Sequence, residues 1–226
     1  MRKKIAVIVA GGSGSRFGGP VPKQFLELAG KPVLMHTIEK FSRLQPVSII
    51  LVLPQGQFGH WRQLCEEYAF TVPHRVVAGG ESRFHSVKNA LDAVDVEVGD
   101  LVAVHDGVRP LVSVDLIDRL FTAAAECGAA IPVVPMTDSV RLLNADGSSR
   151  ALPRALLRAV QTPQAFDGTV LKAAYDVPFL PDFTDDASVV EMTGKQVKLV
   201  DGETTNIKIT HPLDIVVAED ILNHHS

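Results

Sequence analysis

A short apolar run that stops at a cluster of glycines constrains the fold of this chain most. Residues 5–10 are all apolar, and glycines follow at positions 11, 12, 14, 18 and 19. Such a run, bounded by glycine, is typical of a strand buried on both faces of a parallel sheet. Glycine lets the backbone approach a ligand closely, and free N–H groups in such a loop form an anion-binding hollow. The stretch therefore predicts a phosphate site at the carboxyl edge of a sheet.

Two basic side chains, Arg16 and Lys23, support this interpretation of the glycine loop. A P-loop is not indicated, because no Gly-Lys pair is followed by Ser or Thr. A dinucleotide fingerprint needs a third glycine where Phe17 stands, and an acidic residue about 20 positions further on. Glu27 and Glu39 do not end an apolar second strand. A nicotinamide-dependent oxidoreductase is therefore the weaker alternative.

Apolar runs alternate with segments of helical periodicity through the first 134 residues. Strands are expected at 47–53, 75–78, 101–104 and 129–134, and helices at 32–44, 58–70, 82–94 and 114–127. This alternation predicts an α/β fold, a three-layer, doubly wound, mostly parallel sheet of Rossmann-like type. Glycine or charged residues follow Ala10, Ala78 and Val104. Because ligands bind beyond the carboxyl ends of parallel strands, these three loops are expected to form one site.

The second part of the chain breaks this rhythm. Residues 136–156 form an expected β-ribbon arm, because Asn144 to Gly147 is a hairpin signal between two short strands. An isolated ribbon is marginal, so it must rest on its own domain or on a second subunit, and both remain open. A helix is expected from Thr184, with Thr184 as its N-cap and both following aspartates serving its dipole. Helices at 167–175 and 212–222 and a strand at 197–200 complete one domain spanning residues 1–226.

Composition excludes several classes of protein. The formal net charge of −4 argues against a general nucleic-acid-binding surface. Cys65 and Cys127 lack metal-ligand spacing and are expected to be reduced, as in a cytoplasmic protein. The first apolar run is too short for a signal peptide, and no stretch could span a membrane. The histidines show no zinc-ligand spacing, and His105 is expected to be a hydrogen-bonded residue at a strand end.

Several short motifs, taken in order, carry a family resemblance. They are Ala10-Gly11-Gly12-x-Gly14-x-Arg16, Pro22-Lys23-Gln24, Gly79-Gly80-Glu81-Ser82-Arg83-x-x-Ser86-Val87, His105-Asp106-Gly107-x-Arg109-Pro110, Thr162-Pro163-Gln164, Thr184-Asp185-Asp186-Ala187-Ser188 and Asn206-Ile207-Lys208. Together they resemble the sugar-phosphate and polyol-phosphate cytidylyltransferases, and in particular the 2-C-methyl-D-erythritol 4-phosphate cytidylyltransferase family. The resemblance covers residues 4–222. The ribitol-5-phosphate cytidylyltransferases share most of these motifs, so that acceptor remains an alternative.

The resemblance implies a reaction and a set of partners. CTP and 2-C-methyl-D-erythritol 4-phosphate would give CDP-methylerythritol and pyrophosphate, by in-line attack of the acceptor phosphate on the α-phosphorus. The acceptor is already an anion, so the site needs cations rather than a nucleophile or a base. The resemblance further implies Mg²⁺ held by Asp106 and a homodimer that exchanges the arm at 136–156, with no nucleic acid and no membrane as partner.

The resemblance also implies a role for each matching residue. The catalytic residues would be Arg16, Lys23, Asp106 and Lys208. The triphosphate of CTP would bind Ala10, Gly11, Gly12, Gly14, Arg16 and Lys23, and its cytosine would bind Gly80, Arg83 and Ser86. The acceptor would bind Asp106, Gly107, Arg109, Thr162 and Lys208, together with Ser139 and Arg154 from the arm. Two positions depart from the family pattern: Ser139 stands where threonine is expected, and Glu81 where aspartate is frequent. A non-catalytic nucleotide sensor is a further alternative, against which the intact Lys23, Asp106 and Lys208 argue.

Overall fold

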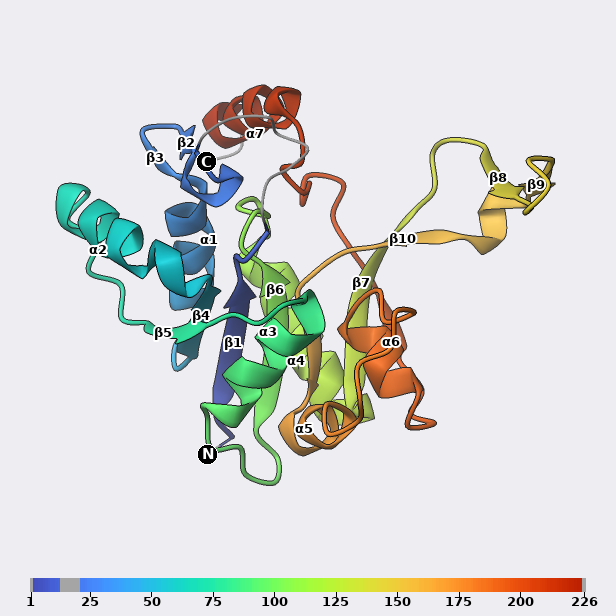
Figure 1. Cartoon of the computed structure of the whole chain (residues 1–226), viewed down its shortest axis with the longest axis horizontal. Helices are drawn as coiled ribbons and strands as arrows, with labels where there is room; N and C mark the ends of the chain where they lie inside the picture. Colours follow the sequence, from blue (N-terminus) through green and yellow to red (C-terminus); the bar gives the residue numbers. More distant parts are fainter. Residues whose placement is uncertain (1, 13–20, 225–226) are drawn as a thin grey trace.

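One mixed sheet forms the centre of the molecule. In residues 2–12 and 21–224, which the computed structural model describes, its eight strands have the order β10-β7-β11-β6-β1-β4-β5, with β12 paired to β7 (Figure 1). Their bounds are β1 Lys4–Val9, β4 Ser48–Leu53, β5 Arg75–Ala78, β6 Leu101–Asp106, β7 Ala129–Pro135, β10 Arg158–Val160, β11 Gln164–Asp167 and β12 Lys198–Asp201. The sheet thus contains the strands that the apolar runs predict.

The order of the parallel strands fixes where a ligand is expected. From β1 the chain runs outward to β4 and then β5, and it returns to the other side of β1 as β6. These four strands are parallel, and β12 is parallel to β7, while β10 and β11 are antiparallel to their neighbours. The predicted α/β class with a mostly parallel sheet is confirmed. In open α/β sheets, ligands bind where the strand order reverses, which here is between the carboxyl ends of β1 and β6.

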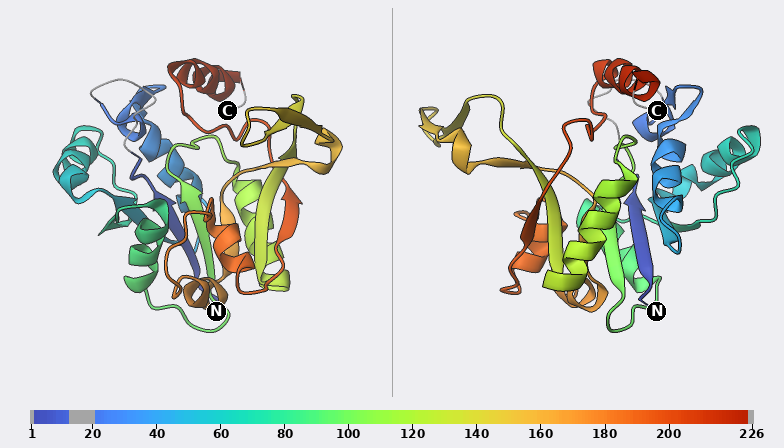
Figure 2. Two further views of the ribbon diagram at one scale, coloured as in Figure 1. Left: turned by 45° about the vertical axis from the view of Figure 1, so that its right-hand side comes forward. Right: turned by 180° about the vertical axis from the view of Figure 1, so that it is seen from behind.

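Helices cover both faces of this sheet (Figure 2). The helices α1 Val33–Ser42, α2 Phe58–Glu67 and α4 Val114–Cys127 share one apolar cluster, and α3 Arg83–Asp92, α5 Gly168–Ala174 and α6 Asp186–Glu191 share the other. Strand β1 contributes to both, because Ala6 and Ile8 lie in the first cluster and Ile5 and Val7 in the second. Alternate side chains of a strand point to opposite faces, which explains why the first apolar run has no polar residues.

The start of α6 differs from the predicted one. Asp185, not Thr184, is the N-cap, because its carboxylate accepts the N–H of Ser188 at 2.9 Å in a capping box. Asp186 does not serve the cap: its side chain is fully buried and forms an ion pair with Arg83. The prediction that both aspartates serve the helix terminus is therefore correct for Asp185 and wrong for Asp186.

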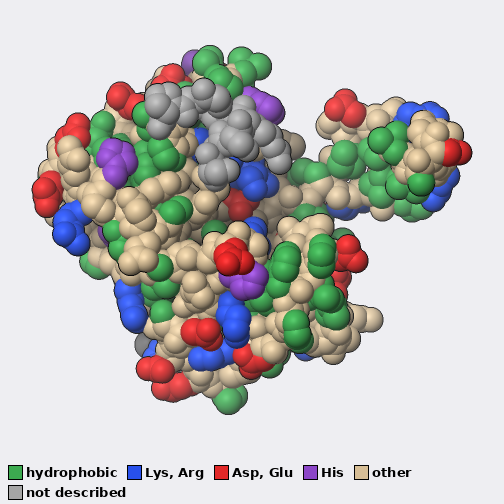
Figure 3. All heavy atoms as spheres, viewed as in Figure 1, with side chains coloured by type: hydrophobic (Ala, Val, Ile, Leu, Met, Phe, Trp, Pro, Cys, Tyr) green, Lys and Arg blue, Asp and Glu red, His purple; other side chains and the backbone are tan. Residues whose placement is uncertain are grey.

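The ribbon predicted from the hairpin signal is present as β8 Val140–Leu143 and β9 Ser149–Leu152. It extends away from the sheet and its helices in Figure 1 and in the right panel of Figure 2, and the space-filling view shows it as a separate lobe that carries hydrophobic side chains (Figure 3). Leu143 and Leu156 on it are 75% and 82% exposed. The ribbon therefore does not fold back onto its own domain.

The last helix packs at the carboxyl edge of the sheet. Helix α7 Pro212–His224 shares a small apolar cluster with the short strand β2 Glu27–Leu28, which pairs with β3 Lys31–Pro32, and Ala218 and Leu28 are buried in it. The remaining elements are single 3₁₀ turns, η1 Lys23–Phe25, η2 Gln55–Gln57 and η3 Arg154–Leu156. Within the described ranges, no helix has the length and apolar character that crossing a membrane requires.

Asp214 stabilises the first turn of α7, and its removal should lower the free energy of unfolding mainly above acidic pH. Its carboxylate accepts the N–H groups of Thr210 and His211, both at 2.7 Å. Burial opposes the charge, but these bonds hold the pKa of Asp214 below its usual value, so the stabilisation is present above about pH 4 and is lost as pH falls through the folded-state pKa. Asp214→Ala should cost about 1 kcal/mol at neutral pH in urea unfolding. A cost that stays constant into acid would contradict this role.

Candidate active site

The carboxyl ends of three parallel strands open into one cavity. It has a volume of about 370 Å³ and is lined by Val9, Ala10, Gly11, Gly12, Lys23, Gln24, Gly80, Glu81, Ser82, Arg83, Ser86, Asp106, Val108 and Lys208. The loops that follow β1, β5 and β6 all contribute, so the predicted convergence of three strand ends is confirmed. The cavity lies where the strand order reverses, between β1 and β6.

Asp106 at the end of β6 is the electrostatic centre of the site. Its carboxylate lies 2.9 Å from Lys208 Nζ, 3.5 Å from Arg109 Nε and 3.7 Å from Arg83 Nε. Burial disfavours its charge, but Arg83, Lys208 and Arg109 together hold the pKa of Asp106 well below its usual range. Three cations therefore surround one carboxylate, and the excess of positive charge suits a polyanionic ligand.

Asp186 holds Arg83 in place by an ion pair. The guanidinium donates from Nη1 at 2.9 Å and from Nη2 at 2.6 Å to the two oxygens of Asp186, and Tyr175 donates its hydroxyl at 2.6 Å to the same carboxylate. Burial opposes the charge of Arg83, but Asp186 raises the pKa of the guanidinium above its usual value. A bidentate pair is the most directional ion pair available, so Arg83 is fixed at the cavity wall.

Gln164 connects the sheet to the start of α6 next to this pair. Its amide nitrogen donates to Asp185 at 2.8 Å, and its oxygen accepts the N–H of Ala187 at 2.9 Å. These contacts set the position of Asp186, which lies between the two bonded residues in the sequence. The motif Thr162-Pro163-Gln164 contains this residue, but sequence reasoning assigned it no role.

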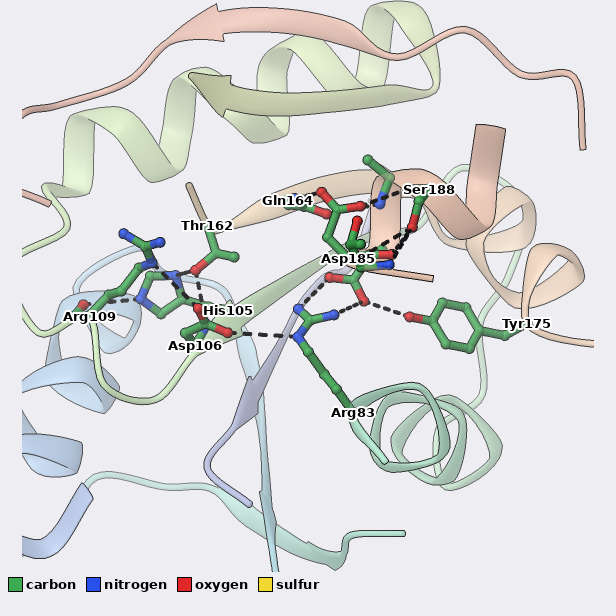
Figure 4. Close-up of polar contacts among 12 residues, drawn as sticks. Arg83, His105, Asp106, Arg109, Thr162, Gln164, Tyr175, Asp185 and Ser188 are labelled. Atoms are coloured by element: carbon green, nitrogen blue, oxygen red, sulfur yellow. Dashed lines mark hydrogen bonds and ion pairs between the residues drawn. The ribbon is translucent and has the colours of Figure 1, made fainter. Parts of the chain in front are cut away.

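A buried chain of hydrogen bonds holds the backbone of Asp106 (Figure 4). Asp106 N–H donates to Thr162 Oγ1 at 3.0 Å, Thr162 Oγ1 lies 3.0 Å from His105 Nδ1, and His105 Nε2 lies 3.1 Å from the carbonyl oxygen of Arg109. Because a carbonyl can accept but not donate, Nε2 carries the proton and Nδ1 accepts from the Thr162 hydroxyl. Burial lowers the pKa of His105 to about 4, so the ring is neutral near pH 7. His105 is thus the hydrogen-bonded strand-end residue that was expected.

The loop that carries Lys208 is held by Gln161 and Asn206. Gln161 Nε2 donates to the carbonyl oxygen of Glu203 at 2.7 Å, and Asn206 Nδ2 donates to that of Thr162 at 2.9 Å. Arg109 Nη1 adds a bond of 2.7 Å to the carbonyl oxygen of Asn206. Lys208 follows two positions later, so its ammonium is directed at Asp106 by a firmly bonded segment.

Two glycines and one glutamine allow close packing at and beside the cavity. A Cβ on Gly107 would lie 2.9 Å from Ala10 Cβ, and one on Gly80 would lie 2.5 Å from His85 Cβ, so neither position has room for a side chain. Gly80 N–H donates to Ser86 Oγ at 3.1 Å. Gln24 Nε2 donates to the carbonyl oxygen of Ala10 at 2.9 Å, which ties the turn bearing Lys23 to the end of β1. Gln24 belongs to the motif Pro22-Lys23-Gln24, but the sequence alone did not indicate its role.

The remaining predicted site residues lie elsewhere. Gly107, Arg109 and Thr162 lie against Asp106 rather than among the residues lining the cavity. Ser139 and Arg154 flank the projecting ribbon, and Arg154 Nη1 donates to the carbonyl oxygen of Thr137 at 2.5 Å. Gly14 and Arg16 lie outside the described residues.

Comparison with known proteins identifies the family. The model of the 2-C-methyl-D-erythritol 4-phosphate cytidylyltransferase family matches residues 4–224. The chain belongs to this family. The resemblance carried by the motifs is thereby confirmed, and this member of the cytidylyltransferase family is an enzyme of the nucleotidyltransferase class. Membership also argues against the nicotinamide-dependent oxidoreductase.

Named relatives and solved structures agree over almost the whole chain. A cytidylyltransferase of this name from Bacteroides fragilis is 51% identical over 220 residues, covering 97% of this chain and 99% of that protein. One from Porphyromonas gingivalis is 50% identical over 222 residues, covering 98% of each. The crystal structure of the Thermus thermophilus enzyme superimposes with a TM-score of 0.77 at 33% identity, over 99% of this chain and 100% of that one. The structure of 4-diphosphocytidyl-2C-methyl-D-erythritol synthase from Anaerococcus prevotii gives 0.83 at 30% identity, over 99% and 97%.

Proposed function

We propose that this chain transfers the cytidylyl group of CTP to 2-C-methyl-D-erythritol 4-phosphate, forming CDP-methylerythritol and pyrophosphate in non-mevalonate isoprenoid biosynthesis. Family membership supports the reaction, and the observation that carries the chemistry is the set of three cations around Asp106, of which Arg83 and Lys208 line the cavity. Ribitol 5-phosphate is the second candidate acceptor, because its cytidylyltransferases share most of the motifs. Pyrophosphate release with each acceptor in turn tests the assignment.

The reaction is a single displacement at phosphorus. A phosphate oxygen of the acceptor attacks the α-phosphorus of CTP in line and pyrophosphate leaves, so one P–O bond forms as another breaks. No proton has to be removed, because the attacking phosphate is an anion. Lys23 and Lys208 line the cavity and stabilise the charge spread over the phosphoryl oxygens. Their fixed positions provide orientation without reorganisation during the reaction.

The residues divide between the two substrates. The triphosphate of CTP binds the backbone at Ala10, Gly11, Gly12 and Gly14 and the side chains of Arg16 and Lys23. The cytosine binds Gly80, Arg83 and Ser86. The acceptor binds Asp106, Gly107, Arg109, Thr162 and Lys208, together with Ser139 and Arg154 of a second subunit. The absence of room for a Cβ at Gly80 holds that loop tightly against His85 at the start of α3, next to Arg83 and Ser86. The Thr162 hydroxyl donates its hydrogen bond to His105 Nδ1, and its oxygen can therefore accept a hydrogen bond from a hydroxyl of the polyol.

A magnesium ion fits the donor set at Asp106. Among the described residues, no three His, Cys, Asp or Glu side chains gather in a group that could hold a metal by themselves. Mg²⁺ is often bound by one or two carboxylates together with substrate phosphates and water, so Asp106 alone is a sufficient protein ligand. Bound there, Mg²⁺ would neutralise phosphate charge, while Arg109 and Lys208 orient the carboxylate.

Asp106→Asn should raise the Mg²⁺ concentration for half-maximal activity by at least about tenfold, because the amide keeps the shape of the side chain but loses its charge. Steady-state rates over a range of Mg²⁺ concentrations measure this shift. Asp92→Asn, a carboxylate at the end of α3 outside the cavity, is the matched control. An unchanged Mg²⁺ dependence in Asp106→Asn would remove Asp106 as the metal ligand.

The ribbon supports a homodimer with shared sites. Its strands extend from the body and expose Leu143 and Leu156, and a two-stranded ribbon is marginally stable without a surface to pack on. A second copy of the chain is the occupant that would bring Ser139 and Arg154 to the other subunit's acceptor.

Subunits with complementary defects should recover activity when mixed. Arg154→Ala leaves the nucleotide loop intact, and Lys23→Ala leaves the arm intact, so a mixed dimer contains one site with neither defect. Denaturing the two inactive variants together and refolding them should give hybrid dimers. Each hybrid dimer has one intact site out of two and should therefore show up to about half the activity of a wild-type dimer. Recovery at no mixing ratio, with dimers verified by light scattering, would count against a shared site.

A further inference from the structure

A second cavity lies at the same edge of the molecule but outside the active site. It has a volume of about 670 Å³ and is bounded by α1, the turn between β2 and β3, the end of α7 and the 203–205 segment. These elements cluster at one end of the molecule (Figure 1). The volume lies in the range of small-molecule sites, and the proposed reaction does not use this cavity.

One face of α1 supplies the charge in this cavity. His36, Glu39, Lys40 and Arg43 follow the spacing of neighbours on a helix face, and all four line the cavity. Glu39 is neutralised by Lys31, whose Nζ lies 2.5 Å from its carboxylate. Among the described residues, neither the Lys40 ammonium nor the Arg43 guanidinium lies within ion-pair distance of a carboxylate. Burial, and then the neighbouring Arg43, lower the pKa of Lys40.

The carboxylate on the opposite wall, Glu203, raises the pKa of Lys40 by its charge but forms no ion pair with Lys40 or Arg43. Glu203 is the other carboxylate lining the cavity, and it is bound to the N-cap of α4, where it accepts the N–H of Ser113 at 3.2 Å and also its hydroxyl proton. It is not within ion-pair distance of Lys40. The rest of the lining includes the apolar side chains of Leu111 and Ile221. The cavity thus combines a net positive end with an apolar wall.

We propose that this cavity binds a small phosphorylated organic molecule, with its phosphate between Lys40 and Arg43 and its carbon body against Leu111 and Ile221. Arg and Lys are the side chains best suited to phosphate, and here the two line one cavity with no carboxylate at ion-pair distance from either. A bound phosphate relieves the repulsion between them, while the apolar wall contributes by losing water. The 203–208 segment borders both cavities, because Glu203 and Thr205 line this one and Lys208 lines the active site.

Histidine-ring NMR of the full chain tests this site directly, because His36 lines the cavity. The probes are butyl phosphate, inorganic phosphate and butanol, and His36→Gln assigns the ring signals. Butyl phosphate should shift the His36 signals saturably and bind more tightly than inorganic phosphate, while butanol alone should have no effect. Lys40→Gln/Arg43→Gln should weaken binding by at least about tenfold, because each charge-assisted hydrogen bond to phosphate is lost.

The control carries the same change of charge elsewhere. Arg62→Gln/Lys88→Gln removes two cations from α2 and α3, outside the cavity, and should bind like the wild type. Absence of a saturable shift at His36, or equal binding by the Lys40/Arg43 double variant, would overturn the proposal. Equal affinity for butyl phosphate and inorganic phosphate would reduce the site to an adventitious ion only. Circular dichroism and thermal unfolding of each variant show that a loss of binding is not a loss of fold.

Discussion

Lys208→Ala should lower kcat by about 100- to 1000-fold while raising the KM for CTP only a few-fold. The ammonium lies in the cavity 2.9 Å from Asp106, held there by the bonded segment that precedes it. Charge on the phosphoryl oxygens shifts most in the transition state, so a fixed cation at this point contributes more to turnover than to CTP binding. Steady-state pyrophosphate release with varied CTP separates the two constants.

Two further variants define what Lys208 contributes. Lys208→Arg keeps the charge but changes its shape, and should recover part of the loss in kcat. Lys172→Ala removes a lysine from α5, outside the cavity, and should leave both constants unchanged. If Lys208→Ala weakened CTP binding as much as it slowed turnover, Lys208 would be a binding residue without a specific role in the transition state.

Asp186→Ala should destabilise the fold by about 3 kcal/mol, because it leaves the buried end of Arg83 and the hydroxyl of Tyr175 without their shared partner. The side chain of Asp186 is fully buried, so water cannot replace the carboxylate. Equilibrium unfolding in urea measures the change. The loss of Arg83 positioning should also raise the KM for CTP in whatever fraction stays folded.

The neighbouring aspartate is the matched control for this variant. Asp185→Ala removes the N-cap of α6 and the acceptor of the Gln164 amide, and should cost about 1–2 kcal/mol, less than Asp186→Ala. A double variant, Asp186→Ala with Arg83→Met, removes the unpaired charge and should recover much of the stability without recovering activity. Equal costs for Asp185→Ala and Asp186→Ala would contradict the different roles that the two contacts indicate.

Much of the fold follows from short-range patterns. The run at residues 5–10 has no polar side chain because β1 is covered on both faces, and the same reasoning identifies β4 and β6. The site follows from where these strands end, because Gly11, Gly80 and Asp106 each follow or end a parallel strand at one edge. The position of the cavity was thus predictable once the strands were placed.

Contacts between distant residues were not predictable in the same way. Asp185 and Asp186 are chemically identical in the sequence, and they differ because Arg83, 103 positions away, meets one of them. The roles of Gln161 and Gln164 also depend on loops that come together only in the folded chain. Similarly, the sequence of the charged face of α1 is typical of a solvated helix surface. In the folded chain, α7 and the 203–205 segment lie beside this face and form a cavity with it.

Product formation with a panel of acceptors is the most direct test of the central claim. The purified full-length protein is incubated with CTP, Mg²⁺ and either 2-C-methyl-D-erythritol 4-phosphate or ribitol 5-phosphate, with Lys208→Ala as the matched control. Pyrophosphate release and the cytidylylated product are then measured together. We expect stoichiometric pyrophosphate and CDP-methylerythritol with methylerythritol phosphate, and little of either product with ribitol phosphate. Turnover with ribitol phosphate but not with methylerythritol phosphate would contradict the assignment.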